Sequence, residues 1–220
     1  HPDPSLGHGD PGYVVTSLYY DSEDLELYWD RKRLQRNRLK VRVRTYGPRN
    51  EGPVFIELKR RVGDVIRKSR ARVPAVAWPH IAEGRPPDPA WDLGPKQQSV
   101  ARDFSAQCIL RGLRPLLSVR YARNPWMGRT DPSLRVTFDR CLRYAAVGGA
   151  EIPADESSYR PMDAPRDFCA EESRVVVEVK FSNRFPDWVV DLVGRYDLNR
   201  QPFSKYCLAV ERILDDGTDF

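Results

Sequence analysis

Cysteine is scarce and scattered in this chain of 220 residues. Its four cysteines, Cys108, Cys141, Cys169 and Cys207, stand far apart and include no CxxC pair. That spacing argues against a zinc site and against the dense disulfide framework of small secreted domains. A reducing compartment is therefore the expected environment.

The chain also has few histidines, and no glycine-rich loop follows a predicted strand. The three histidines, His1, His8 and His80, lie in loop-like stretches rich in proline or glycine. This argues against a catalytic triad and against a histidine metal cluster. Neither GxxxxGK[ST] nor a strand followed by GxGxxG is present, so nucleotide binding by such a loop is unsupported.

Long apolar runs are missing as well. No stretch approaches the roughly 20 apolar residues that a transmembrane helix needs, and no signal peptide is recognisable. We expect a cytoplasmic domain that reaches a membrane only through a segment outside this sequence. The opening His1-Pro2-Asp3-Pro4 resembles the interior of a protein rather than its start, so we expect further residues upstream.

Acidic residues are rare in one part of the chain, which points to an anionic partner. Between Arg31 and Arg72 there are sixteen lysines and arginines but only three acids, Glu51, Glu57 and Asp64. Such an excess focuses positive potential and favours a polyanion. Nucleic acid, anionic lipid and condensed phosphate all fit the charge alone.

The basic residues follow the two-residue period of a β-strand. In the segment 39–46, Lys40, Arg42 and Arg44 share one face, and three aliphatic residues share the other. Like charges on one face repel one another, so they need water or an anion. The alternation recurs with Phe55, Glu57 and Lys59, with Ile66, Lys68, Arg70 and Arg72, and with Glu178 and Lys180.

The wider pattern predicts a single α+β domain over residues 1–220. Strands are expected at 13–20, 28–34, 38–46, 54–61, 65–73, 116–123, 133–140, 143–146 and 175–181, and helices at 96–113, 186–196 and 205–214. Closing an antiparallel sheet into a barrel removes its edges, and a barrel of about eight strands can enclose one ligand. We therefore predict an antiparallel β barrel with flanking helices, lined by charge.

The charged positions have a simpler alternative interpretation. A charged strand face is usually solvated, but this excess is basic rather than mixed, and it is rich in arginine, whose planar guanidinium suits phosphate. Glu57 and Glu178 each precede a lysine by two residues. They either pair with neighbouring cations or give carboxylate oxygens to Mg²⁺ or Mn²⁺, and Asp139 is open to the same two interpretations. The aromatic-basic interleave of RNA-binding sheets is not evident, so nucleic acid is not the expected partner.

A series of short motifs stands in a fixed order from about Tyr13 to Glu211. Its members are Ser17-Leu18-Tyr19-Tyr20-Asp21, Asp24-Leu25, Leu27-Tyr28, Lys40-Val41-Arg42-Val43-Arg44-Thr45-Tyr46-Gly47, Phe55-Ile56-Glu57-Leu58-Lys59, Lys68-Ser69-Arg70, Tyr121-Ala122-Arg123, Arg135-Val136-Thr137-Phe138-Asp139, Glu178-Val179-Lys180 and Phe203-Ser204-Lys205-Tyr206. Each motif alone is weak, but their joint order resembles the VTC domain. This is the polyphosphate polymerase family within the triphosphate tunnel metalloenzymes, or CYTH-like superfamily.

The resemblance implies a tunnel-shaped antiparallel barrel that binds a triphosphate or a polyphosphate chain. It implies a metal site for Mn²⁺ or Mg²⁺ at Glu178, and the strand pattern makes Glu57 the second candidate metal ligand. Family members open with a strand that supplies a phosphate-binding lysine, and this sequence begins after that position, so we expect the first strand to be missing here. The implied phosphate-binding residues are Arg42, Arg44, Lys59, Lys68, Arg70, Arg123, Arg135, Lys180 and Lys205, of which Arg42, Arg44, Lys59, Arg123 and Lys205 are the implied catalytic set.

The implied activity is a phosphotransferase that synthesises polyphosphate. It would move the γ-phosphoryl of ATP, or of another nucleoside triphosphate, to the end of a growing polyphosphate chain. Alternatives are a triphosphatase of the same fold, and a module that binds polyphosphate or inositol polyphosphate without turnover. Nucleic-acid binding follows from charge alone and fails if the charges line a narrow tunnel.

Overall fold

The computed structural model of the chain describes residues 12–48, 53–165, 174–182, 185–198 and 200–217. The strands are β1 (Tyr13–Asp21), β2 (Arg38–Tyr46), β3 (Val54–Val62), β4 (Val65–Val73), β5 (Arg114–Met127), β6 (Arg135–Ala146), β7 (Arg160–Pro161) and β8 (Val176–Lys180). The helices are α1 (Glu26–Lys32), α2 (Ala77–Ala82), α3 (Pro95–Leu110), α4 (Asp187–Arg195) and α5 (Lys205–Asp215). Two 3-10 turns lie at Pro89–Trp91 and Glu156–Ser158.

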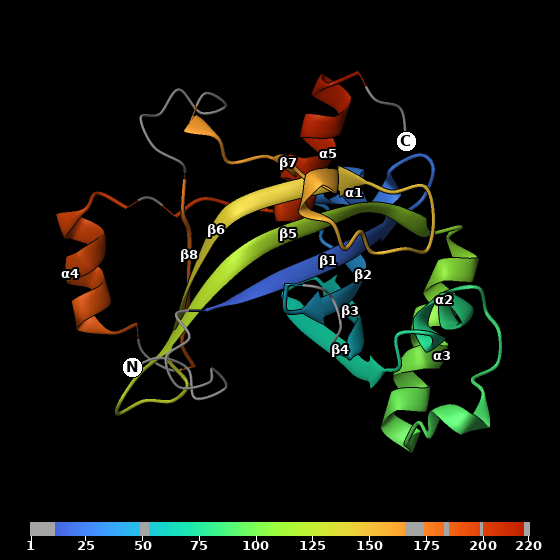
Figure 1. Ribbon diagram of the computed structural model, residues 1–220. Coiled ribbons are helices and arrows are strands. Elements are labelled where there is room, and N and C mark those ends of the chain that lie inside the picture. The colour runs from blue at the N-terminus through green and yellow to red at the C-terminus, as the bar shows by residue number, and fades with distance from the viewer. Residues whose placement is uncertain (1–11, 49–52, 166–173, 183–184, 199, 218–220) are drawn as a thin grey trace.

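The strands form one eight-stranded antiparallel sheet, which confirms the predicted fold class (Figure 1). Its order is β4-β3-β2-β1-β5-β6-β7, and β8 also pairs with β6. Among the described residues, β4 pairs with β3 alone and β8 with β6 alone. In the part of the chain that the structure describes, the sheet is therefore a curved path of strands whose two ends do not hydrogen-bond to each other.

The β2–β3–β4 meander forms as the alternating pattern predicts. Aliphatic residues of β2 and β3 meet across the sheet, as in the pair Val43 and Ile56. The tight turn between Val62 and Val65 contains Gly63 at a φ of +57°. That left-handed conformation favours glycine, because a Cβ atom would be strained there.

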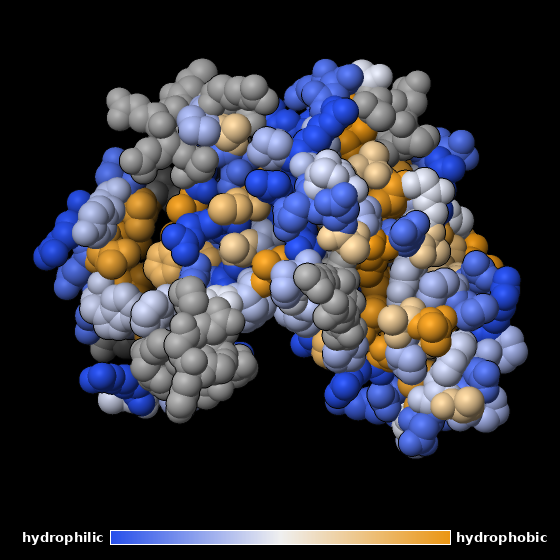
Figure 2. All heavy atoms as spheres, in the orientation of Figure 1, coloured by the Kyte–Doolittle hydropathy of each residue, from blue (hydrophilic) through white to orange (hydrophobic). Residues whose placement is uncertain are grey.

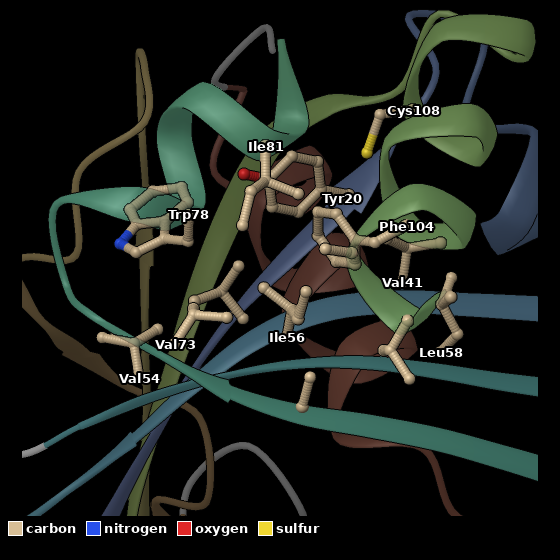
Figure 3. Close-up of a cluster of buried hydrophobic side chains, with 14 of the residues drawn as sticks. Tyr20, Val41, Val54, Ile56, Leu58, Val73, Trp78, Ile81, Phe104 and Cys108 are labelled. Carbon is tan, nitrogen blue, oxygen red and sulfur yellow. The ribbon is translucent and has the colours of Figure 1, made fainter. Parts of the chain in front are cut away.

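One face of β1–β4 packs against α2 and α3 to form the larger hydrophobic core (Figure 3). Phe104 of α3 is fully buried, and its ring meets that of Tyr20 edge-on at 5.5 Å. Burying an aromatic or aliphatic side chain of this size stabilises the fold by roughly 1.5–3 kcal/mol. This core holds the β2–β3–β4 meander in place. The charged residues therefore lie on the opposite face of the meander.

Helix α5 covers part of that opposite face over β1, β5 and β6. Ser204 caps it by accepting a hydrogen bond from the Cys207 amide, and Tyr206 and Val210 lie in a second core. Buried Asp21 accepts hydrogen bonds from the amides of Leu27 and Tyr28, at 2.8 and 2.9 Å, and from the Tyr206 hydroxyl. Asp21 thus ties the start of α1 to α5, although burial raises the pKa of its carboxyl.

Helix α4 lies on the side of the molecule away from α2 and α3 (Figure 1). Val189 is buried, whereas Trp188 and Val190 are about half exposed. Figure 2 shows hydrophilic and apolar residues interspersed over the visible face, with apolar residues both on the α4 side and on the side of α2 and α3. No helix in the described part of the chain has both the length and the apolar character that crossing a bilayer requires.

Two sequence predictions are wrong at the level of elements. Residues 28–34 were expected to form a strand, but α1 covers Glu26–Lys32, because Asp21 caps its first amides. Residues 133–140 and 143–146 were expected to be separate strands, yet both belong to β6. Cys141 has a left-handed φ of 54°, and the pairing with β5 shifts opposite Arg120 and Ala122. The irregularity is a bulge within one strand, not a turn.

Candidate functional site

The strand register gathers the basic side chains on the face of the sheet that α2 and α3 leave free. Arg42 lies opposite Tyr19 on β1 and opposite Glu57 on β3, and Arg44 lies opposite Ser17. Because side chains alternate along each strand, these residues project to the same side. The sequence prediction of a charged face is therefore confirmed for β2 and β3.

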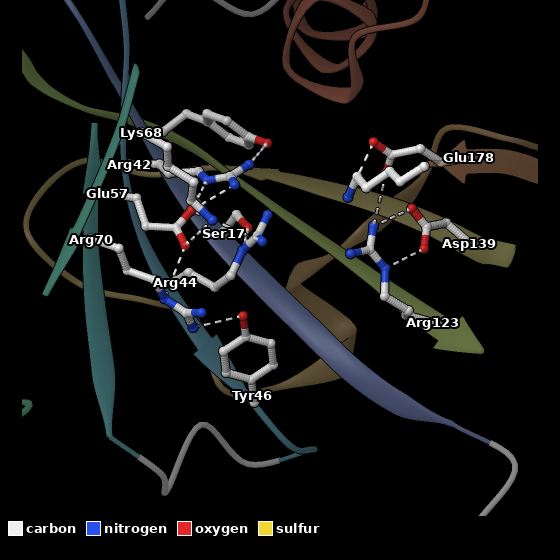
Figure 4. Close-up of polar contacts among 12 residues, drawn as sticks. Ser17, Arg42, Arg44, Tyr46, Glu57, Lys68, Arg70, Arg123, Asp139 and Glu178 are labelled. Atoms are coloured by element: carbon white, nitrogen blue, oxygen red, sulfur yellow. Dashed lines mark hydrogen bonds and ion pairs between the residues drawn. The ribbon is translucent and has the colours of Figure 1, made fainter. Parts of the chain in front are cut away.

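The first cluster is built around Glu57, whose side chain is 3% exposed (Figure 4). Its Oε2 atom lies 2.6 Å from an Arg42 Nη atom and 4.0 Å from Arg44. Its Oε1 atom lies 3.2 Å from both Lys68 Nζ and Arg70 Nε. One carboxylate thus serves four cations, so the cluster keeps a net positive charge that a phosphate can neutralise.

The Glu57 carboxyl titrates far below its ordinary range. Burial alone would raise its pKa, but the charges of Arg42, Arg44 and Lys68 lower the pKa to about 2. Glu57 is therefore ionised at every physiological pH. Its charge holds the four cations in place on β2 and β4.

Neutral groups orient two of the arginines. Arg44 Nε donates to Ser17 Oγ at 3.0 Å, and Arg70 donates to the Tyr46 hydroxyl at 2.9 Å. The Arg70 guanidinium also lies 3.7 Å from the Phe55 ring centroid, a cation–π contact. Both side chains are held in place before any ligand arrives, which reduces the ordering cost of binding.

The second cluster lies across β1, on β5, β6, β8 and α5 (Figure 4). Asp139, 1% exposed, accepts two hydrogen bonds from Arg123 at 2.7 and 2.8 Å, and it pairs with Lys205 at 2.7 Å. Glu178 Oε2 lies 4.0 Å from Arg123, and Oε1 lies 3.4 Å from Lys180. Burial would raise the pKa of Asp139, but Arg123 and Lys205 hold it below the ordinary value.

Tyr19 stands between the two clusters on β1. Its hydroxyl accepts a hydrogen bond from Arg42 at 3.3 Å, and its ring packs on that of Tyr206 at 5.1 Å. Burial would raise the pKa of the phenol, but the nearby charges of Arg42, Lys40 and Arg44 lower it to about 8. The lowered pKa of Tyr19 therefore reflects the positive potential of this face of the sheet.

The remaining predicted residues lie outside both clusters. Lys59 is exposed and pairs across strands with Lys40. Arg135 is exposed at the far end of β6, opposite Lys180. The structure thus brings together seven of the nine predicted phosphate-binding residues in two groups: Arg42, Arg44, Lys68 and Arg70, and then Arg123, Lys180 and Lys205.

Sequence reasoning missed the groups that orient the cations. Ser17 and Tyr19 alternate with apolar Leu18, and this period marked their face, but the pairing register was needed to match them with Arg44 and Arg42. Asp139 was considered only as one more acid open to two interpretations. Its contacts with Arg123 and Lys205 make it the counter-ion of the second cluster.

A divalent cation suits Glu178 better than Glu57. No three histidine, cysteine or acidic residues converge within the part of the chain that the structure describes. Mg²⁺ and Mn²⁺ can be held by one or two carboxylates plus phosphate oxygens and water, and Glu178 offers one carboxylate that is 47% exposed. Both oxygens of Glu57 already contact cations, so Glu57 matches the ion-pair interpretation instead.

Comparison with curated proteins finds a relative that is longer than this chain. The chain is 24% identical over 233 aligned residues to vacuolar transporter chaperone complex subunit 4 of Schizosaccharomyces pombe. The match covers 92% of this chain and 32% of the yeast protein. The chain therefore spans about a third of the length of that curated relative.

Comparison with solved structures and with domain families gives two further results. A Bacillus halodurans protein with a provisional identity as an adenylate cyclase is 10% identical, with a TM-score of 0.45, and the match covers 91% of this chain and 82% of that one. The VTC domain matches residues 4–214 of this chain, almost its whole length. The chain belongs to the VTC domain family.

Proposed function

We propose that this domain is a metal-dependent phosphotransferase that moves the γ-phosphoryl of ATP, or another nucleoside triphosphate, to the end of a polyphosphate chain. The observation that carries the proposal is the pair of basic clusters on one face of the sheet. Arg42 and Arg44 lie on one side of β1, and Arg123 and Lys205 lie on the other. Membership of the VTC domain family supports the same activity.

The reaction needs positioning and charge neutralisation more than a protein nucleophile. An oxygen of the chain's terminal phosphate attacks the γ-phosphorus. The bond from that phosphorus to the β,γ-bridging oxygen breaks, and ADP leaves with the electron pair. The attacking oxygen is already anionic, so no side chain has to remove a proton from it. Arg42, Arg44 and Arg123 bring two polyanions together and stabilise the charge that develops.

Glu178 is the residue that would hold the metal, with its remaining ligands drawn from phosphate and water. A bound Mn²⁺ or Mg²⁺ supplies further neutralisation of phosphate charge. Lys180 beside Glu178 keeps the carboxylate oriented, at 3.4 Å. Within the second cluster, Arg123 links Glu178 to Asp139.

The direct test is to incubate the protein with ATP and Mn²⁺ and to separate the products on a gel. We expect ADP and a polymer whose length grows with time. Glu178→Gln is expected to lower metal-dependent turnover more than nucleotide affinity, and Glu151→Gln, another exposed acid, is the matched control. Free phosphate without polymer would replace the proposal with a triphosphatase. Tight, salt-sensitive binding without ATP consumption would replace it with a binding module.

Anion affinity is expected to fall as the pH rises through about 8, where Tyr19 ionises. Below that pH the neutral phenol adds no negative charge beside Arg42, and above it a phenolate pairs with Arg42 and repels the ligand. Tyr19→Phe should remove this alkaline decline, whereas Tyr46→Phe, which deletes another hydroxyl from the same face, should retain it. The measurement is tripolyphosphate affinity against pH, with phenolate absorbance followed in parallel. An unchanged decline in Tyr19→Phe would contradict the assignment.

A further inference from the structure

Thr137 of β6 carries a buried hydroxyl without a partner. The residue is 8% exposed, and its Oγ1 atom makes no hydrogen bond within the part of the chain that the structure describes. Leaving a buried hydroxyl unpaired costs stability. Valine has nearly the same shape and a similar preference for strands, so packing alone does not account for a threonine at this position.

The strand register places this hydroxyl in the second cluster. Thr137 lies directly opposite Glu178 on β8 and opposite Pro125 on β5. Asp139, two residues further along β6, contacts Arg123, and alternation puts Thr137 on that same face. The Cβ atoms of directly opposed residues are about 4.5–5.5 Å apart in an antiparallel pair. The Thr137 hydroxyl and the Glu178 carboxylate therefore adjoin the same small region.

A second buried threonine shows that burial alone does not make a ligand. Thr45 of β2 is fully buried, and its Oγ1 atom likewise has no hydrogen-bond partner among the described residues. Thr45 follows Arg44 directly and lies opposite Thr16, so it projects to the face away from the two clusters. Thr137 differs because its unpaired hydroxyl lies beside a carboxylate that is half exposed.

The neighbouring carboxylates decide what the hydroxyl can share. Both oxygens of Asp139 accept hydrogen bonds from Arg123, and one of them also contacts Lys205 at 2.7 Å. Glu178 has only looser contacts, at 3.4 and 4.0 Å, to Lys180 and Arg123. A carboxylate with a neutral oxygen beside it suits a divalent cation, and threonine or serine hydroxyls bind Mg²⁺ in phosphate-binding loops. A neutral ligand adds no charge that would repel phosphate.

We infer that the Thr137 hydroxyl is a second protein ligand for the divalent cation that Glu178 would hold, in place of one water. An oxygen lone pair of the hydroxyl binds the cation, and its proton remains available to a phosphate oxygen. Two ligands on neighbouring strands hold a cation more firmly than one exposed carboxylate does. The inference rests on the metal dependence of the proposed function and not on phosphoryl transfer itself.

The test measures Mn²⁺ affinity from the paramagnetic resonance signal of the free ion, with a non-hydrolysable ATP analogue present. Thr137→Val should weaken Mn²⁺ binding by about 10–100-fold, the usual range when groups around a metal are altered. Thr137→Ser, which keeps the hydroxyl, should retain most of the affinity. Thr45→Val is the matched control, because it removes a buried unpaired hydroxyl from the other face, and it should leave Mn²⁺ affinity unchanged.

Two further measurements separate a ligand from a structural role. In water labelled with a magnetic oxygen isotope, the signal of bound Mn²⁺ should show one more coordinated water in Thr137→Val than in the wild type. Without metal, the variant should bind the analogue as the wild type does. Its metal-free thermal midpoint should equal or exceed that of the wild type, since an unpaired buried hydroxyl is removed.

The possible failures are distinguishable. Equal Mn²⁺ affinity in Thr137→Val and the wild type would overturn the inference. So would weaker metal-free binding of the analogue by the variant, which would assign the hydroxyl to phosphate instead. A wild type that binds no Mn²⁺ would overturn it together with the metal dependence of the proposed function. Mn²⁺ binding that depends on Thr137, without ATP turnover, would overturn the proposed activity and leave the Thr137 assignment standing.

Discussion

Replacing Glu57 by glutamine is expected to lower the free energy of unfolding by about 3–5 kcal/mol, the usual cost of removing one partner from a buried ion pair. Glu57 is 3% exposed and lies within 4.0 Å of Arg42, Arg44, Lys68 and Arg70. Without its charge, four cations repel one another, and the repulsion is screened least at Arg42 and Arg44, whose side chains are only 17% and 9% exposed. Urea unfolding followed by circular dichroism measures the effect.

The same carboxylate predicts how stability depends on pH. The pKa of Glu57 is about 2 in the folded protein against 4.5 for the free group. Because the folded value is depressed, the stabilisation is present above about pH 4.5 and is lost as the pH falls through about 2. The shift corresponds to about 3 kcal/mol. Glu57→Gln should show a correspondingly flatter stability curve between these two pH values.

A matched substitution separates this effect from the loss of any surface acid. Glu83 pairs with Arg85 at 2.8 Å, but both side chains are more than half exposed. Glu83→Gln should therefore change stability by at most about 1 kcal/mol. Inorganic tripolyphosphate should restore more stability to Glu57→Gln than to the wild type, because the anion replaces the missing charge. Equal stability of Glu57→Gln and the wild type would contradict the role given to Glu57.

The charged meander could be predicted from the sequence because its signals are local. Alternation in β2 and β3 assigns each side chain to a face, and the turn at Gly63 sets the hairpin. A register shift of one residue would move every cation to the apolar face. The fold class and the basic face therefore follow from the period alone.

The missed elements depend on contacts that are distant in sequence or on an irregular backbone. Helix α1 is only seven residues long, too short to be stable alone, and it is capped by Asp21, which α5 also contacts through Tyr206. Strand β6 continues through Cys141, whose φ is left-handed. The alternating apolar pattern is interrupted there, so the sequence predicts a break between two strands. Neither feature has a local signature.

In the candidate site, too, local features could be predicted from the sequence and contacts distant in sequence could not. The sequence indicated which cations line the face, but it could not tell that Glu57 would take four partners rather than a metal. Nor could it place Arg123 against Asp139, because that pairing follows the bulge between β5 and β6. Which charges compensate each other is set by register across strands, and that register is a tertiary property.

Asp139→Asn is expected to lower polyphosphate synthesis by about 10²–10³-fold, the typical cost of losing one preorganised stabilising group at a reaction centre. Asp139 holds Arg123 through two hydrogen bonds and Lys205 through a third contact at 2.7 Å. An asparagine keeps one acceptor and turns an amide donor toward two cations. The change should lower kcat more than it raises the KM for ATP. Asp191→Asn on exposed α4 is the matched control.

A double-mutant cycle distinguishes a positioning role from a merely structural one. If Asp139 acts by orienting Arg123, then Asp139→Asn should add little to the loss already caused by Arg123→Ala, because the two changes remove the same contact. A structural defect would instead multiply with Arg123→Ala and would lower the unfolding midpoint in proportion. Independent, multiplicative losses in turnover would show that Asp139 contributes apart from Arg123, and the second cluster would then have to be explained through Lys205 alone.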